Sequence, residues 1–158
     1  MNLAPEFKEF VAVMKAAGVE FVVVGAFVRA FYGNPRYTGD IDFWIKPTKK
    51  NARAVLQALA AFGFSSLCLT EKDLLSGDII QLGQPPLRID LLTALDGVDA
   101  DEIWSSRTEG PLGDETVFYL GREIYLKNKR AAGRPKDLAD LAALENPAKA
   151  KRSRRPSG

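Results

Sequence analysis

The sequence predicts a single α/β (or α+β) domain in which helices pack on one side of a short mixed β-sheet. A chain of 158 residues that is 46% hydrophobic fits one domain with a core of its own. Apolar residues recur at helical spacing and in short β-branched runs, in the order helix, strand, helix, strand, helix over residues 3–62. We expect this domain to span residues 1–147. Residues 148–158, which are basic and contain no acidic residue, are expected to form a disordered tail that either binds RNA or is inert.

The elements of the first half follow from local signals. The expected order is a helix from Leu3 that ends before Gly18, a strand over 19–24, a short helix over 26–31, a strand over 40–46 and a helix over 48–62. Residues 19–24 are β-branched or aromatic apart from one acid, which is typical of a strand buried on both faces. Thr48 precedes the last helix as an N-cap.

The second half carries shorter signals. The expected elements are a strand over 65–69, a capping box at 70–73, a hairpin of strands 78–82 and 87–92, a helix over 101–106, strands 117–120 and 123–126, and helices over 126–132 and 136–144. In the strand over 87–92, Arg88 and Asp90 share the face opposite Ile89 and Leu91. Asp90 therefore points away from the core.

The segment TGDIDFWI at 38–45 is the most informative part of the chain. In a strand Asp40 and Asp42 share one face, while Ile41 and Phe43 point to the core. Two neighbouring carboxylates repel each other unless a cation or a raised pKa relieves the repulsion. The plainer alternative is that Asp40 caps a turn and Asp42 is exposed on an edge strand.

Composition narrows the choice of cation. The chain has no histidine and one cysteine, Cys68, so it lacks the usual ligands of zinc, copper or iron–sulfur clusters. Cys68 is expected to be a small buried residue. Carboxylate oxygens suit Mg²⁺, which is often held by one or two carboxylates together with substrate phosphates.

The sequence contains no long apolar span and no signal-like start, so we expect a cytoplasmic protein that does not bind membranes.

A family resemblance rests on these residues. Gly25-Ala26, then Asp40-Ile41-Asp42, then Asp90 in a later strand, resembles the signature of the nucleotidyltransferases related to DNA polymerase beta. The resemblance is strongest to small prokaryotic members near abortive-infection and toxin–antitoxin systems. The segments GNPRYTGDIDFWI and NKRAAGRPKDLADLAAL are also similar to that branch, and the resemblance spans roughly residues 19–144.

The resemblance implies a magnesium-dependent nucleotidyltransferase that moves a nucleoside monophosphate from an NTP to a hydroxyl of a protein, a tRNA or a small molecule. Asp40, Asp42 and Asp90 would be catalytic and would hold two Mg²⁺ ions, with Mn²⁺ as a substitute; Asp90 would also help deprotonate the acceptor. The implied nucleotide-binding residues are Gly25, Ala26, Arg29, Arg36, Thr38 and Lys129.

One position departs from the family pattern, because Ala26 stands where Gly or Ser is usual and offers no hydroxyl to phosphate. The alternative is therefore an inactive nucleotide-binding or protein-interaction module of the same fold, with a partner protein as in a toxin–antitoxin pair. Trp44 either covers the sheet or stacks on a base. Lys129 either lies on a solvated helix face or reaches phosphate, and Asp137 and Asp140 are expected to stabilise a helix terminus.

Overall fold

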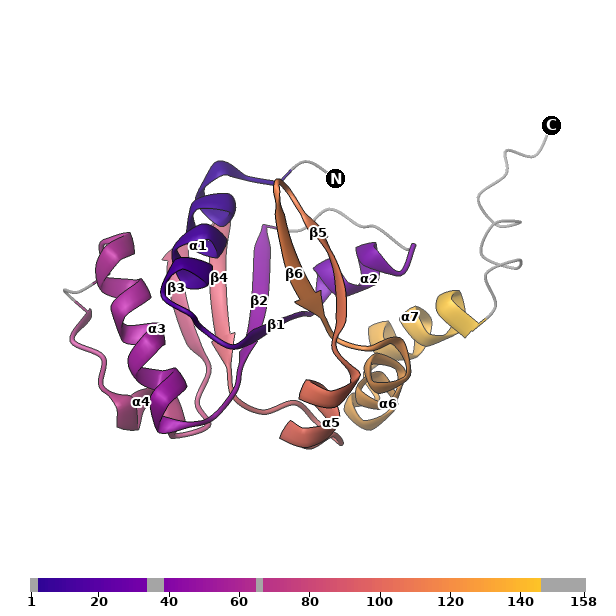
Figure 1. The fold of residues 1–158 in the computed structure, drawn as a ribbon. Helices are drawn as coiled ribbons and strands as arrows, with labels where there is room; N and C mark the ends of the chain where they lie inside the picture. Colours follow the sequence, from indigo (N-terminus) through magenta and orange to yellow (C-terminus); the bar gives the residue numbers. More distant parts are fainter. Residues whose placement is uncertain (1–2, 34–38, 65–66, 146–158) are drawn as a thin grey trace.

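The computed structural model describes residues 3–33, 39–64 and 67–145. The described elements, in chain order, are α1 (Pro5–Ala16), β1 (Phe21–Val24), α2 (Ala26–Phe31), β2 (Asp40–Ile45), α3 (Lys49–Phe62), α4 (Glu71–Leu75), β3 (Ile80–Gln84), β4 (Leu87–Leu92), α5 (Ala100–Ser106), β5 (Thr108–Leu112), β6 (Glu115–Tyr119), α6 (Arg122–Ala132) and α7 (Pro135–Glu145). Figure 1 shows the strands as one layer flanked by helices. The predicted mixed α/β architecture is confirmed.

Within the described residues, six strands form an open mixed sheet in the order β3-β4-β2-β1-β6-β5. The strands β4 and β2 run parallel, as do β1 and β6, while the other neighbouring pairs are antiparallel. In the β2–β4 register Asp42 lies opposite Asp90 and Asp40 lies opposite Arg88. The topology thus brings residues 48 positions apart to adjacent places on the sheet.

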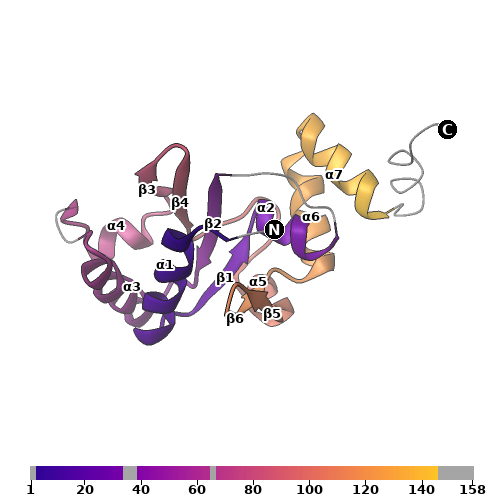
Figure 2. The same ribbon diagram turned by 90° about the horizontal axis from the view of Figure 1, so that it is seen from above.

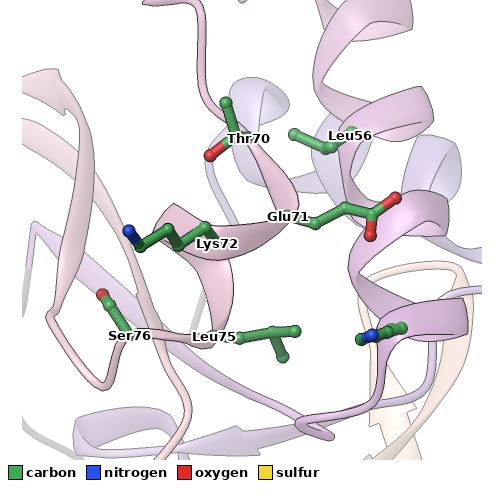
Figure 3. Close-up of a pocket in the computed structure, with 7 residues that line it drawn as sticks. Leu56, Thr70, Glu71, Lys72, Leu75 and Ser76 are labelled. Carbon is green, nitrogen blue, oxygen red and sulfur yellow. The ribbon is translucent and has the colours of Figure 1, made fainter.

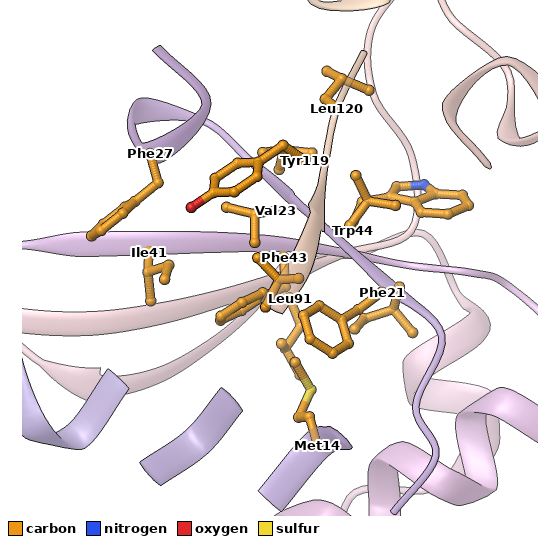
Figure 4. Packing of buried hydrophobic residues seen from close by; sticks show 14 of the residues in the cluster. Met14, Phe21, Val23, Phe27, Ile41, Phe43, Trp44, Leu91, Tyr119 and Leu120 are labelled. Atoms are coloured by element: carbon orange, nitrogen blue, oxygen red, sulfur yellow. The ribbon is translucent and has the colours of Figure 1, made fainter. Parts of the chain in front are cut away.

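The main core lies between the sheet and α1. Phe10 of α1 packs against Phe43 of β2 with ring centroids 5.6 Å apart, and against Phe62 of α3 at 5.3 Å. Phe21 meets the same Phe43 ring edge-on at 5.5 Å. Figure 4 shows Phe43 and Phe21 pointing toward Met14. These aromatic contacts hold β2 firmly against α1. They thereby fix the position of the two acids, which lie on the other face of β2.

The opposite face of the sheet is also partly covered. Val22, Val24 and Trp44 share that face with Asp42, and their exposed fractions are 0%, 3% and 0%. Figure 2 shows α6 and α7 across the central strands from α1 and α3, so helices flank both sides of the sheet and not one side as predicted. The Trp44 side chain is buried and its Nε1 donates to the Thr93 carbonyl at 3.2 Å, so it covers the sheet and offers no surface for base stacking.

The structure corrects the prediction for residues 108–126. Residues 123–126, predicted as a strand, lie within the helix α6. Tyr125 and Leu126 are on the buried face of this helix, and Arg122 and Glu123 are on its exposed face. The strand β5 has no counterpart in the prediction because Gly110 and Pro111 are poor strand formers. β5 is an edge strand, where proline is tolerated.

Residues 67–69 are not a strand, and residues 65–66 of that prediction lie outside the described part of the chain. Cys68 is exposed, with φ of 53°, and is therefore not the buried residue that its apolar neighbours predict. The capping box at Thr70 is confirmed, since Thr70 and Asp73 exchange side chain to backbone hydrogen bonds. The predicted basic tail at 148–158 also lies outside the described residues.

Asn51 joins α3 to the ends of two strands. Its side chain is buried, accepts a hydrogen bond from the Glu20 N–H at 2.7 Å, and donates to the carbonyls of Glu20 and Lys46 at 2.8 and 2.9 Å. We expect Asn51→Ala to lower the free energy of unfolding by about 2–4 kcal/mol, because it leaves buried backbone groups unsatisfied. Urea denaturation measures this loss.

Asn128→Ala is the matched control for Asn51. The Asn128 amide donates to one backbone carbonyl, that of Asp96, at 2.9 Å at an exposed site. Its loss is expected to stay within about 1 kcal/mol. Equal effects of the two substitutions would contradict the structural role of Asn51.

Candidate functional site

The structure brings the three predicted acids together on one face of the sheet. Asp40 and Asp42 lie on β2, and Asp90 lies beside Asp42 on the parallel strand β4. The side chains of Asp42 and Asp90 can share a hydrogen bond when one of them is protonated, and both Asp90 and Asp40 act on Asp42 through their charge. Asp90 is buried, whereas Asp40 and Asp42 are partly exposed. The face is therefore accessible from the side of β2.

Gly25 forms one wall of this acid site. It follows β1 with φ of +72°, a conformation that favours glycine, and it precedes the first residue of α2, the half-buried Ala26. A Cβ at position 25 would overlap the carboxylate of Asp42. The turn after β1 thus requires glycine for two separate reasons, its backbone conformation and the close approach of Asp42.

The ionised form of Asp42 is disfavoured by its surroundings. Burial and the neighbouring Asp90 raise the pKa of Asp42 to about 7, with smaller contributions from its hydrogen bond to Asp90 and from the charge of Asp40, while Arg88 acts in the opposite direction. The folded protein therefore favours a protonated Asp42 or a nearby cation. Perturbed carboxylates of this kind are frequent at functional sites.

This raised pKa makes a prediction about stability. The ordinary pKa of an aspartate is about 3.9, so the stabilisation by neutral Asp42 is complete below about pH 4 and is lost as the pH rises through about 7. Asparagine resembles the neutral carboxyl. In metal-free buffer at pH 8 we expect Asp42→Asn to melt at a higher temperature than the wild type, with a difference that shrinks toward pH 5. The exposed Asp96→Asn serves as control, and an Asp42→Asn protein that is less stable at pH 8 would contradict the prediction.

Arg88 is a member of the site that the sequence interpretation did not include. Its Nε and Nη2 donate to the two carboxylate oxygens of Asp90 at 2.9 and 3.1 Å, and Nη2 also donates to Asp40 at 3.2 Å. The pKa of Arg88 is raised by these hydrogen bonds and by the nearby acids. The signal was present in the sequence, because Arg88 alternates onto the same strand face as Asp90.

Arg29 and Lys129 lie in a different cluster, between helices. Buried Arg29 of α2 pairs with Asp140 of α7 at 3.3 Å, and Lys129 of α6 contacts Asp137 at 3.0 Å and Asp140 at 3.5 Å. Both cations are thus engaged by carboxylates of α7. A contact of Arg29 or Lys129 with phosphate stays a prediction. In this arrangement phosphate would have to compete with Asp137 and Asp140 for the two cations.

Asp137 fulfils the expected role at a helix terminus. It accepts a hydrogen bond from the backbone N–H of Arg134, just before α7, and two more from the Arg134 guanidinium. Burial would raise the pKa of Asp137, but the hydrogen bonds from Arg134 and Lys129 outweigh burial and lower the pKa to about 2. The cluster fixes α7 against α6 and α2.

Two predicted nucleotide-binding residues, Arg36 and Thr38, lie outside the described residues. They precede β2 in sequence, next to Gly39 and Asp40. A contact of either residue with nucleotide stays a prediction.

The donor set of the acid site fits a hard divalent cation. Carboxylate oxygens from Asp40, Asp42 and Asp90 gather on one face, and the mutual repulsion around Asp42 is the kind that a cation relieves. In the described part of the chain, no three acidic, histidine or cysteine side chains are already arranged as a metal cage. The ion pairs of Arg88 explain this, because they direct the carboxylates of Asp40 and Asp90 toward the guanidinium and not toward a common metal position.

A separate groove of about 820 Å³ lies between α3 and α4. Figure 3 shows Leu56 and Leu75 with the polar side chains of Thr70, Glu71 and Ser76 around them. None of the three acids lines this groove, so it is distinct from the acid site.

Among the helices that the structure describes, none has the length and apolar character needed to cross a lipid bilayer. Comparison with models of known protein families finds none that matches this chain. Comparison with curated proteins likewise finds no significant match.

Proposed function

We propose that this chain is a magnesium-dependent nucleotidyltransferase that transfers a nucleoside monophosphate from an NTP to a hydroxyl group. One observation carries the proposal: Asp42 and Asp90 lie side by side on parallel strands, with Asp40 on the same face and Gly25 against Asp42. The resemblance of these positions to the polymerase-beta-like signature supports the same activity. The acceptor stays open among a protein side chain, a tRNA and a small molecule.

The roles of the residues follow from their positions. Asp40 and Asp42, which are partly exposed, would hold Mg²⁺ together with the triphosphate, and Asp90 would complete the metal site and accept the proton of the attacking hydroxyl. Bound Mg²⁺ supplies charge stabilisation at the attacking and leaving oxygens. Gly25 keeps the backbone beside Asp42 free of a side chain, so that phosphate can approach the main chain there.

The direct test is transfer itself. Purified protein is incubated with each α-³²P-labelled NTP, with Mg²⁺, with Mn²⁺ or with EDTA, and with total tRNA, cell lysate proteins or small-molecule extracts. We expect label to move to one acceptor class only in the presence of a divalent ion. Transfer that proceeds equally in EDTA would contradict the proposal.

A second candidate is an inactive nucleotide-binding or protein-interaction module of the same fold. Two observations favour it: Ala26 offers no hydroxyl to phosphate, and Arg88 pairs with both Asp40 and Asp90 without a metal. This candidate predicts no transfer with any acceptor, and co-purification with a partner protein from the native host.

A further inference from the structure

The position of Arg88 gives the acid site a cation of its own. Arg88 lies on β4 opposite Asp40 and two residues before Asp90, so its side chain leaves the sheet on the face of the acids. It binds Asp90 in a two-pronged contact at 2.9 and 3.1 Å and reaches Asp40 at 3.2 Å. One guanidinium thus joins the acid of β4 to the first acid of β2.

This contact involves the oxygens that a metal ion would need. Both carboxylate oxygens of Asp90 and one oxygen of Asp40 accept hydrogen bonds from Arg88. Mg²⁺ binds carboxylate oxygen at about 2.0–2.1 Å and requires near-octahedral geometry. A divalent ion at that distance would also repel the adjacent guanidinium, and the repulsion is poorly screened where Asp90 is buried.

The guanidinium is placed so that it can leave. The side chain of Arg88 is 29% exposed and that of Asp40 is 44% exposed, whereas that of Asp90 is only 10% exposed. Arg88 therefore has solvent on one side, and its departure requires no rearrangement of the buried core. The buried Asp90 cannot follow it, and would remain as a carboxylate in need of another cation.

We infer that Arg88 is a displaceable counter-ion of the acid site, whose guanidinium must leave Asp90 before a divalent cation binds there. The inference rests on the proposed function, because it takes Asp40, Asp42 and Asp90 as metal ligands. Arg88 then offsets part of the negative charge of the site and occupies oxygens of Asp90 and Asp40 in the absence of metal. The apparent affinity for a divalent ion is lowered by the fraction of molecules in which Arg88 is bound to the acids.

The test measures metal binding to the intact, metal-free chain. Mn²⁺ titration followed by electron paramagnetic resonance is carried out on the wild type and on Arg88→Gln, without nucleotide. If Arg88 occupies the site in about nine molecules of ten, its removal tightens Mn²⁺ binding about tenfold. Damage to the site, as expected from a merely structural role of Arg88, would weaken Mn²⁺ binding instead.

Arg53→Gln is the matched control. Arg53 also pairs with a carboxylate through its Nε, that of Glu71 at 2.7 Å, but it lies on α3 away from the acid site and its side chain is 66% exposed. Its Mn²⁺ affinity should equal that of the wild type. Equal or weaker Mn²⁺ binding by Arg88→Gln, alongside wild-type binding that is clearly measurable, overturns the inference and leaves the proposed function standing. Absence of Mn²⁺ binding by both proteins, with or without NTP, overturns both.

A second readout needs no variant. The Nε–H resonance of Arg88 in ¹⁵N-resolved spectra of the wild type reports its hydrogen bond to Asp90. We expect this resonance to shift and to exchange faster with solvent when Mg²⁺ is added. A resonance that stays unchanged at saturating Mg²⁺ would overturn the inference even if Arg88→Gln failed to fold.

Discussion

Asp42→Asn should reduce nucleotidyl transfer by about 10³-fold while the protein remains folded. The amide keeps the size of the carboxylate but lacks the charge that holds a divalent ion against its hydration shell. Stabilisation by such an ion is worth several kcal/mol, and roughly each 1.4 kcal/mol corresponds to a tenfold change in rate. The transfer assay with labelled NTP measures the loss, and circular dichroism at pH 8 checks the fold.

Asp96→Asn provides the control for this loss, since Asp96 is an exposed aspartate in the turn before α5. It should transfer at the wild-type rate. An Asp42→Asn protein with full activity would exclude Asp42 as a metal ligand. Because the same substitution is expected to raise the melting temperature at pH 8, a loss of activity from unfolding is readily distinguished from a loss of chemistry.

Gly25→Ala is expected to damage both the fold and the site. At φ of +72° and ψ of −145°, a backbone conformation found almost only in glycine, a side chain costs about 1–3 kcal/mol. The added Cβ would overlap the Asp42 carboxylate, and relief of such crowding costs about 1–3 kcal/mol more. We therefore expect a lower free energy of unfolding and, because Asp42 is pushed from its place, loss of transfer by about 10²-fold. Urea denaturation and the transfer assay measure the two effects.

Gly18→Ala separates the two contributions. Gly18 follows the C-terminus of α1 with φ of +74°, close to the φ of Gly25. Among the described residues beyond its own chain neighbours, no atom lies within 4 Å of the position that its Cβ would take. It should show the backbone penalty alone, with normal transfer. Equal losses of activity in both variants would mean that the contact of Gly25 with Asp42 does not matter to the site.

Local signals were sufficient for most of the fold. Apolar residues at helical spacing, β-branched runs and the N-cap Thr48 predicted the first five elements, and alternation placed the acids on one face of β2. These signals depend only on neighbours in sequence. The strand β5 was missed because its Gly-Pro pair is locally unfavourable in a strand and is tolerated only through the tertiary structure. Proline is accepted there because β5, in the sheet that the described residues form, pairs on one side only, with β6. Gly110 is accepted because the Phe31 ring lies where its Cβ would be. Such information comes from tertiary structure.

The candidate site was predictable in part. The approach of Asp90 to Asp42 follows from parallel pairing of β2 with β4, which the local pattern did not specify but the family resemblance implied. The engagement of Arg29 and Lys129 with Asp140 depends on how α7 packs against α2 and α6, and no short-range pattern contains it. The contact of Arg88 with Asp90 is between neighbours on one strand face, whereas its contact with Asp40 depends on the pairing register of β4 with β2, which the local pattern did not specify.

The central claim is that the acids of β2 and β4 bind a nucleotide through a divalent cation. Isothermal titration of a non-hydrolysable NTP into the wild type and Asp42→Asn, each with Mg²⁺ and with EDTA, tests it most directly. We expect binding by the wild type with Mg²⁺, and at least about a tenfold loss on removal of the ion or of the Asp42 charge. Nucleotide binding that is the same under all four conditions, or no binding under any of them, would contradict the claim.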